Sequence, residues 1–348
     1  MSDEYLAGLD PESAPKEEES TFDYVWPRAL LLGCSLLYGT NFPLGKVMNA
    51  AFPASEAALL RFGIAALALS PCLAQLKPSV ARPAVECGVF VAMGYIGQAI
   101  ALETEPAATV GFICALAVVW CPLLEFVVDR KPVGTSTWIA AALAIVGVFL
   151  LEIGPDGGVS PSWGDAWALL QCVGFGTAFW RTEKMMARNP DQTLPITAVQ
   201  VTVAALASLA WFVLDGGSLD SVLAPSPQGA AAASAGAVSL ELGPLGELIG
   251  GFLPEGVSPA ALAAVAWTGL VTTALNRLGE TTSLGKISSS DATVLLCTEP
   301  IWAAVFAVYL LDEQLGANAI AGGALITVAC LVNSLGPAMM PRERGATS

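Results

Sequence analysis

The chain has 348 residues, of which 55% are hydrophobic and 13% charged, and its mean hydropathy is +0.65. An ordinary soluble domain has about 25% charged residues, so this composition predicts a polytopic membrane protein. The net charge of -15 argues against a nucleic-acid partner. Because histidine is absent, histidine-dependent catalytic triads and the commonest zinc ligand are excluded.

The eight cysteines fall almost entirely inside apolar runs and show no CxxC spacing. We interpret them as small buried hydrophobes, with disulfides or metal ligands as the alternative. The acidic residues form no dense cluster with metal-ligand spacing, and the glycines show no phosphate-loop pattern between a strand and a helix. The sequence therefore predicts neither a bound metal nor a cofactor.

Residues 1–27 are acidic, contain proline and have few apolar side chains, which predicts a disordered cytosolic tail. This segment has neither the basic start of a secretory signal nor the arginine-rich composition of a transit peptide. From residue 28 onward the sequence predicts about ten apolar spans of ~20 residues, the length that crosses a bilayer, in one helical bundle. The predicted spans are 28–48, 55–75, 84–103, 107–127, 135–152, 163–183, 194–214, 260–283, 290–311 and 317–336.

The stretch 215–258 is of low complexity and contains no lysine or arginine, which predicts a flexible inserted loop. Lys46 is predicted on the outer side, and Arg61 and Arg277 lie within spans, whereas the other lysines and arginines fall on the side of the N-terminus. The positive-inside rule therefore predicts that both termini, including a C-terminal tail at 337–348, face the cytosol. The predicted host is the plasma membrane or an endomembrane, with an organelle envelope as an alternative.

An internal repeat is visible in the spans. YGTNF at 38–42 in the first span recurs as FGTAF at 175–179 in the sixth, which gives a period of five helices. This period predicts a first five-helix repeat at 28–152 and a second at 153–336 that contains the inserted loop. An odd number of helices per copy places the second copy upside down in the membrane.

The flanking charges show the same inversion. Arg130 and Lys131 follow the fourth span, whereas Asp312 and Glu313 follow the ninth. Inverted repeats of this kind are typical of secondary transporters, whose substrate site lies between the halves near the middle of the membrane.

The ordered motifs resemble those of the drug/metabolite transporter superfamily, specifically its EamA-type members. The resemblance implies an all-α membrane protein with ten helices in two inverted halves that exports or exchanges small metabolites by alternating access. Branches of similar fold that carry sugar phosphates typically place basic pairs in late helices, which the ninth and tenth spans lack, so we rank sugar phosphates low. The matching segments are YGTNFPLGK at 38–46, ALLRFGIAAL at 58–67, GFICALAVVWCPLLEFVVDRKP at 111–132, WIAAALAIVGVFLLE at 138–152 and TEPIWAAVFAVYLLDEQLGANAIAGGALI at 298–326.

Glu299 and Pro300 stand side by side within the ninth span. Proline removes a backbone donor, so the helix is expected to kink or open there, and an ionised carboxylate at that depth costs a few kcal/mol unless it faces a partner or water. Glu299 is predicted to be a proton acceptor or a ligand for a substrate amine. The alternative is a structural cap for the broken helix.

Arg277 and Glu280 are three residues apart on the eighth span, so they share a helix face and can pair. They are predicted either to form a gate, with Arg277 pairing to Glu299 in one state, or to form a permanent buried ion pair. Gln98 on the third span is their weak pseudosymmetric counterpart.

Other candidates belong to the first, second, fourth and ninth spans. Arg61 is predicted to snorkel to the interface, with substrate contact as the alternative. Asn41, beside the expected helix break at Pro43, either faces substrate or bonds between helices. Trp120 and Trp302 either wall a cavity or serve in packing and lipid contact.

Together these features favour a secondary transporter of a small organic metabolite, driven by a proton gradient or by exchange. A receptor or scaffold that kept the fold and a membrane-embedded enzyme are the alternatives, and the missing GxSxG and HExxH motifs disfavour the enzyme. The expected partners are the lipid bilayer and a small-molecule metabolite. The sequence leaves the oligomeric state open, a homodimer included.

Overall fold

The computed structural model describes residues 21–130, 132, 134–151, 162–218 and 259–339. The inserted loop and the tails predicted at both ends therefore lie largely outside the described residues. Within them every regular element is helical and no strand occurs. The first part of the chain contains α1 (Thr21–Gly39), α2 (Asn41–Ala51), α3 (Ala54–Leu69), η3 (Ser70–Gln75), α4 (Pro78–Thr104), α5 (Ala107–Cys114), α6 (Ala117–Val127) and α7 (Thr135–Leu151).

The second part begins with α8 and ends with α17. Its helix α8 starts with a capping box in which Ser162 and Asp165 bond each other's backbone N–H groups. The elements are α8 (Trp163–Arg188), η4 (Pro190–Gln192), α9 (Thr193–Leu214), α13 (Pro259–Ala266), the π-helix η5 (Trp267–Leu275), α14 (Asn276–Leu284), α15 (Ser289–Leu296), α16 (Glu299–Leu311) and α17 (Ala317–Met339).

The start of α1 corrects the sequence prediction. Residues 21–27, assigned above to a disordered tail, form its first turns. The guanidinium of Arg28 lies 3.7 Å from the ring centroid of Tyr24 and donates a hydrogen bond of 2.7 Å to the Tyr24 carbonyl. These contacts, with the apolar side chains of the segment, stabilise a helical turn that an acidic composition alone does not predict.

Within the described parts of the chain, five helical segments have both the length and the apolar composition to cross a membrane. The shorter apolar helices are Trp138–Leu150, Glu299–Leu311 and Ala317–Val332. The five long segments are Ala54–Gln75, Pro78–Thr104, Ala107–Val127, Pro190–Leu214 and Pro259–Leu284.

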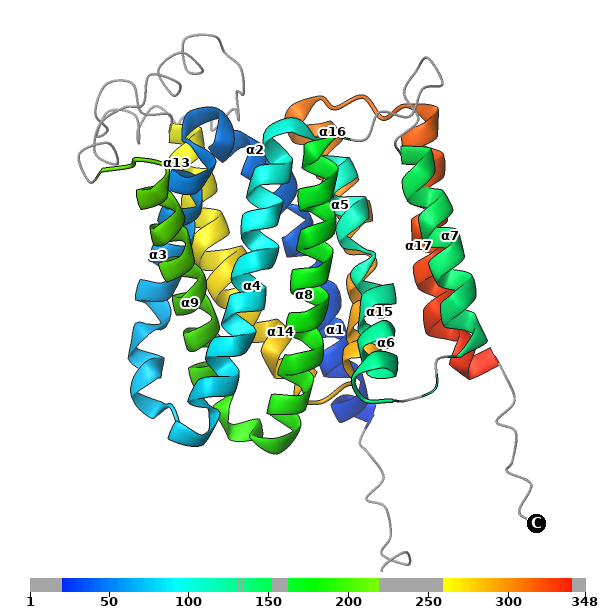
Figure 1. Cartoon of the computed structure of the whole chain (residues 1–348), viewed down its shortest axis with the longest axis horizontal. Coiled ribbons are helices and arrows are strands. Elements are labelled where there is room, and N and C mark those ends of the chain that lie inside the picture. Colours follow the sequence, from blue (N-terminus) through cyan, green and yellow to red (C-terminus); the bar gives the residue numbers. More distant parts are fainter. Residues whose placement is uncertain (1–20, 131, 133, 152–161, 219–258, 340–348) are drawn as a thin grey trace, which may run out of the picture.

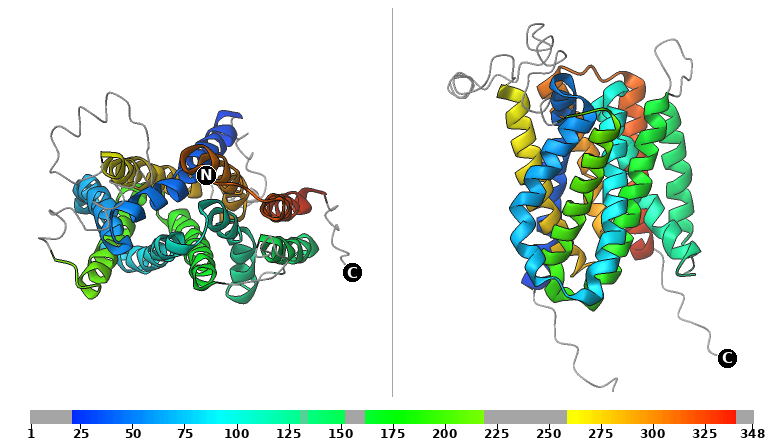
Figure 2. Two further views of the ribbon diagram at one scale, coloured as in Figure 1. Left: turned by 90° about the horizontal axis from the view of Figure 1, so that it is seen from above. Right: turned by 60° about the vertical axis from the view of Figure 1, so that its left-hand side comes forward.

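The helices stand side by side, with α7 and α17 paired at one edge of the bundle (Figures 1 and 2). The beginning of α1 and the end of α17 lie at the same end. In the centre α4 and α8 approach closely, because a Cβ added to Gly174 would meet the backbone nitrogen of Gly94 at 2.6 Å. The absence of a side chain at Gly94 and Gly174 thus allows the two helices to pack closely.

Three long segments are interrupted in mid-course. α1 gives way to α2 at Thr40, and α15 gives way to α16 at residues 297–298. Pro43 and Pro300 lie in the first turns of α2 and α16, where a missing backbone N–H costs little, and a helix is interrupted just before each of them. The third break, between α5 and α6 at residues 115–116, was not predicted.

Candidate functional site

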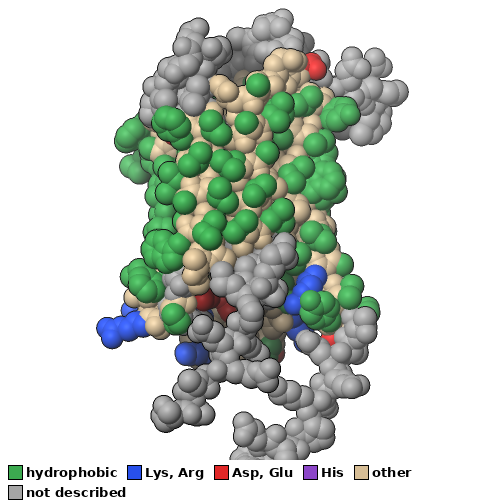
Figure 3. Space-filling view, turned by 90° about the vertical axis from the view of Figure 1, so that its right-hand side faces the viewer, with side chains coloured by type: hydrophobic (Ala, Val, Ile, Leu, Met, Phe, Trp, Pro, Cys, Tyr) green, Lys and Arg blue, Asp and Glu red, His purple; other side chains and the backbone are tan. Residues whose placement is uncertain are grey.

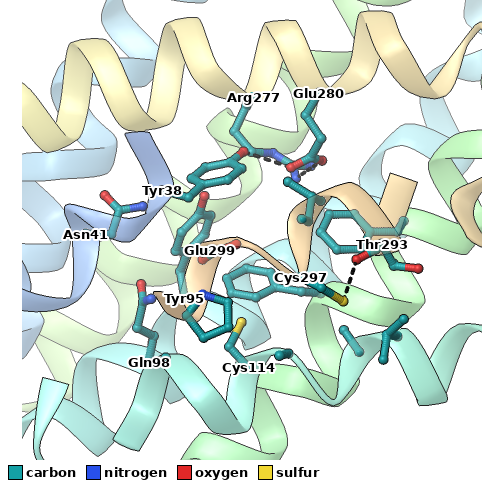
Figure 4. Close-up of a pocket in the computed structure, with 18 residues that line it drawn as sticks. Tyr38, Asn41, Tyr95, Gln98, Cys114, Arg277, Glu280, Thr293, Cys297 and Glu299 are labelled. Carbon is teal, nitrogen blue, oxygen red and sulfur yellow. Dashed lines mark hydrogen bonds and ion pairs between the residues drawn. The ribbon is translucent and has the colours of Figure 1, made fainter. Parts of the chain in front are cut away.

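An internal cavity lies among the broken helices and their neighbours α4, α8 and α14. It comprises about 550 Å³ of space between atoms, open solvent included, and its lining combines tyrosine and phenylalanine rings with a few polar side chains (Figure 4). Of the predicted site residues, Asn41, Gln98, Arg277, Glu280, Glu299 and Pro300 line it. The structure thus brings together candidates that are up to 259 positions apart, from Asn41 to Pro300.

Glu299 is the first residue of α16 and points into the cavity (Figure 4). The break before it is held by Thr298, whose hydroxyl lies 2.7 Å from that of Ser35 on α1. Within the described part of the chain the Glu299 carboxylate accepts no hydrogen bond and forms no ion pair. It is therefore left to a proton, to water or to a ligand, and the capping contacts expected for a structural role are absent among the described residues.

Arg277 and Glu280 form an ion pair on α14, and both side chains are 1% exposed. The pair does not stand alone, because Tyr38 donates a hydrogen bond of 2.8 Å to Glu280 and Arg277 donates one of 2.7 Å to Gln200. The side-chain amide of Gln200 in turn donates a hydrogen bond of 3.1 Å to the hydroxyl of Thr182. These bonds offset part of the desolvation cost of a buried ion pair.

Arg277 forms no ion pair with Glu299, the alternative partner that the sequence suggested. Arg277 binds Glu280 and not Glu299, although all three line one cavity. Its Nε has no hydrogen-bond partner within the described residues, so the guanidinium keeps an unused donor. In the view of Figure 4, Arg277 and Glu280 lie across the cavity from Gln98.

Asn41 begins α2 and is held by the π-helix, since its side-chain oxygen accepts a hydrogen bond from Thr272. This is the interhelical bond that the sequence left as one of two alternatives. The amide nitrogen of Asn41 has no partner within the described residues, and neither has the amide of Gln98, although that side chain is 3% exposed. Both side chains also line a second cavity toward α3.

Arg61 contradicts the favoured prediction that it snorkels to the interface. Its side chain points into the bundle, with 5% exposure, and its Nε donates a hydrogen bond of 2.9 Å to Thr273. The guanidinium lies 4.7 Å from the ring centroid of Tyr95 and 5.1 Å from that of Phe62. These partners hold the side chain inside, where it lines the second cavity.

The two tryptophans pack between helices and line neither of these cavities. Trp120 donates a hydrogen bond of 3.0 Å to Thr177, and a Cβ on Gly176 would meet its Cδ1 at 2.7 Å. A Cβ on Gly39 would meet the Cβ of Trp302 at 2.5 Å. The ring of Trp120 therefore packs over Gly176, whereas Gly39 packs against the Cβ and backbone of Trp302, and both contacts fit the packing alternative that the sequence also allowed.

Sequence reasoning missed Tyr38, Tyr95 and Gln200, which bring the aromatic surface and the hydrogen bonds to the charged pair. Two weak signals were available. Tyr38 belongs to the repeated YGTNF motif, and Tyr95 lies three residues before Gln98, on the same face of α4.

Ion pairs join the helices near both ends of the bundle. At one end Lys46, on α2, lies 3.8 Å from Glu313, whose carboxylate also accepts a hydrogen bond of 2.9 Å from the N–H of Ala107. At the other end Lys184, on α8, pairs with Asp129, which follows α6. Each ion pair joins the first part of the chain to the second.

A bundle of helices that are long and apolar enough to cross a membrane places the chain in the class of multi-pass membrane proteins. The model of the EamA-like transporter family matches residues 26–153 and again 162–335, so the chain belongs to this family of the drug/metabolite transporter superfamily. The double match also confirms the duplication predicted from YGTNF and FGTAF.

Comparison with solved structures gives 27 matching chains. One crystal structure aligns with a TM-score of 0.59 and 16% identity, covering 92% of this chain and 99% of the other. At that identity the likeness shows the fold alone. The comparison with curated proteins gives no match.

Proposed function

We propose that the protein is a secondary transporter that moves a small organic metabolite across a membrane by alternating access, coupled to protons or to exchange. The observation that carries this proposal is the carboxylate of Glu299, which lines the cavity at a helix break and has no partner among the described residues. Such a group can take up a proton or a substrate cation and become neutral when the cavity closes. Membership of a transporter family supports the proposal.

The proposed architecture is ten spanning helices in two inverted five-helix halves. Matched contacts support it: Gly39 of YGTNF lies against Trp302, and Gly176 of FGTAF lies against Trp120. The helices that carry these tryptophans, α16 and α6, are both followed by a residue with positive φ, Asp312 at 52° and Arg130 at 56°.

The ion pairs at the two ends of the bundle also join equivalent positions of the two proposed halves. Lys46 on α2 pairs with Glu313 of the second half, and Lys184 near the end of α8 pairs with Asp129 of the first half. We propose that these pairs hold the two ends in alternation. Breaking one pair while keeping the other opens one side of the cavity.

We further propose that both termini face the cytosol, in the plasma membrane or an endomembrane. Figure 3 supports this orientation: apolar side chains cover the middle of the face that it shows, and lysines and arginines gather at the end where α1 begins and α17 ends. That distribution follows the positive-inside rule.

The test is uptake by liposomes that contain the purified protein, supplied with a mixed pool of amino acids, nucleobases, sugars and organic acids. Mass spectrometry reads the accumulated compounds with and without a pH gradient. Glu299→Gln is compared with the wild type and with Glu103→Gln, which makes the same change at an exposed position at the end of α4.

We expect gradient-dependent accumulation of one compound class by the wild type and Glu103→Gln, and its loss in Glu299→Gln. Equal uptake by all three proteins would remove Glu299 from the transport path. No uptake by folded protein would favour the receptor or scaffold alternative instead.

A further inference from the structure

The second cavity lies between α2, α3 and α4 and comprises about 330 Å³ of space between atoms, open solvent included. It shares Asn41, Tyr95 and Gln98 with the central cavity, so the two adjoin. Arg61 supplies the only charged side chain among the residues described as lining it. The proposed role of Glu299 does not use this space.

Among the residues that the structure describes, no anion neutralises the guanidinium of Arg61. Within the described residues it forms no ion pair, and its Nη2 is buried without a hydrogen-bond acceptor. Its partners are the hydroxyl of Thr273 and the faces of two aromatic rings, all of which are uncharged. A buried charge without a counter-ion is unfavourable, so the site favours any ligand that brings a negative charge.

Arg277 provides the internal comparison. It is as deeply buried as Arg61, but Glu280 neutralises it and Gln200 accepts a further hydrogen bond. The protein therefore supplies a carboxylate to one buried arginine and none, within the described residues, to the other. The difference indicates that the missing carboxylate at Arg61 comes from outside the chain.

We propose that Arg61 and the second cavity form a binding subsite for the carboxylate group of a small organic anion. A guanidinium presents its N–H groups in a planar fork that matches a carboxylate, which favours a carboxylate over a spherical ion. The unpartnered amide of Gln98 adds a hydrogen-bond donor, and the ring of Tyr95 adds a flat apolar surface. If the protein is the transporter proposed above, the subsite makes small organic carboxylates its substrate class, and this part of the inference rests on the proposed function.

The test measures binding by detergent-purified full-length protein, with benzoate as the probe and benzamide as a neutral molecule of the same shape. A ligand that binds only the folded state raises the unfolding temperature in a saturable way. We expect this rise with benzoate and not with benzamide. We expect the same rise in Arg82→Gln, which removes an arginine whose side chain is 91% exposed.

Two variants at the site separate binding from folding. Arg61→Lys keeps the charge but loses the fork, so we expect at least a tenfold weaker response to benzoate. Arg61→Met removes the buried charge, so we expect a folded protein with no response. Arg277→Met, which leaves Glu280 buried and unpaired, is expected to be less stable than Arg61→Met.

The proposal is overturned if wild type shows no response to benzoate, or if Arg61→Met responds as wild type does. It is also overturned if chloride competes as well as benzoate, because the site would then be one for simple anions. Binding needs no gradient, so this result is independent of the uptake assay. Benzoate binding by a protein that transports nothing keeps the subsite and rejects the transporter, and uptake without Arg61-dependent binding does the reverse.

Discussion

The breaks between α5 and α6 and between α15 and α16 have similar backbones and different chemistry. A cysteine that lines the central cavity stands at each break: Cys114 is the last residue of α5, and Cys297 is the first residue after α15. Two residues further on, the first break carries Leu116, which packs against apolar clusters. The second carries Glu299, which faces the cavity without a partner among the described residues. A helix break gives room for a site, and the side chain placed there decides whether a site forms.

The largest effect is expected from a carboxylate at the apolar break. Leu116→Glu places a charge among apolar neighbours, and we expect it to lower the free energy of unfolding by roughly 2.5–3.5 kcal/mol. Thermal unfolding in detergent measures the loss. Leu116→Met keeps volume and polarity, so its expected cost is below about 1.5 kcal/mol. Equal stability of the two variants would show that both breaks accept a carboxylate.

The two glycine–tryptophan contacts next to the breaks are expected to lose similar amounts of stability when a methyl group is added to the glycine. Gly39→Ala forces a methyl group against Trp302, and Gly176→Ala forces one against Trp120, so each is expected to cost about 1–3 kcal/mol. Gly33→Ala is the control, because nothing lies within 4 Å of the added Cβ, and we expect it to stabilise α1 by about 0.5–1 kcal/mol. A large cost at only one of the two grooves would contradict the proposed equivalence of the halves.

The smallest effect concerns the contact that holds the second break to α1. Ser35→Ala removes the hydrogen bond to Thr298 and is expected to cost about 0.5–1.5 kcal/mol of stability. The same assay measures it. Thr202→Ala serves as the control, since its hydroxyl donates only to the carbonyl of Ala198 within its own helix. If Ser35→Ala costs no more than this control, the bond does not fix the geometry around Glu299.

Local chemistry made part of this site predictable. Proline excludes a backbone donor wherever it stands, so breaks beside Pro43 and Pro300 could be proposed without knowledge of the fold, although Pro27, Pro83 and Pro122 lie inside uninterrupted helices. The spacing of Arg277 and Glu280 similarly fixes a shared helix face. The break at residues 115–116 contains neither proline nor glycine, and its backbone bonds span three residues instead of four, a change that tertiary packing decides.

The unpredicted contacts depend on how each helix is rotated within the bundle. Arg61 was expected to reach the interface because a spanning helix with one cation usually exposes it there. Instead the orientation of α3 brings the side chain to Thr273 and Tyr95, which belong to other helices. Gln200 likewise gains its importance only from Arg277, 77 positions away along the chain. Sequence patterns report which residues are polar, but not which polar residues meet.

The π-helix η5, Trp267–Leu275, makes the direction of the side chains that follow it depend on the exact number of residues in this segment. A π turn contains more residues than an α turn, so every side chain after it is rotated relative to a continuous α-helix. Deleting one residue from η5 is expected to turn Arg277 and Glu280 by about 100° away from the cavity. Such a deletion is therefore expected to be more harmful than most substitutions in the same segment.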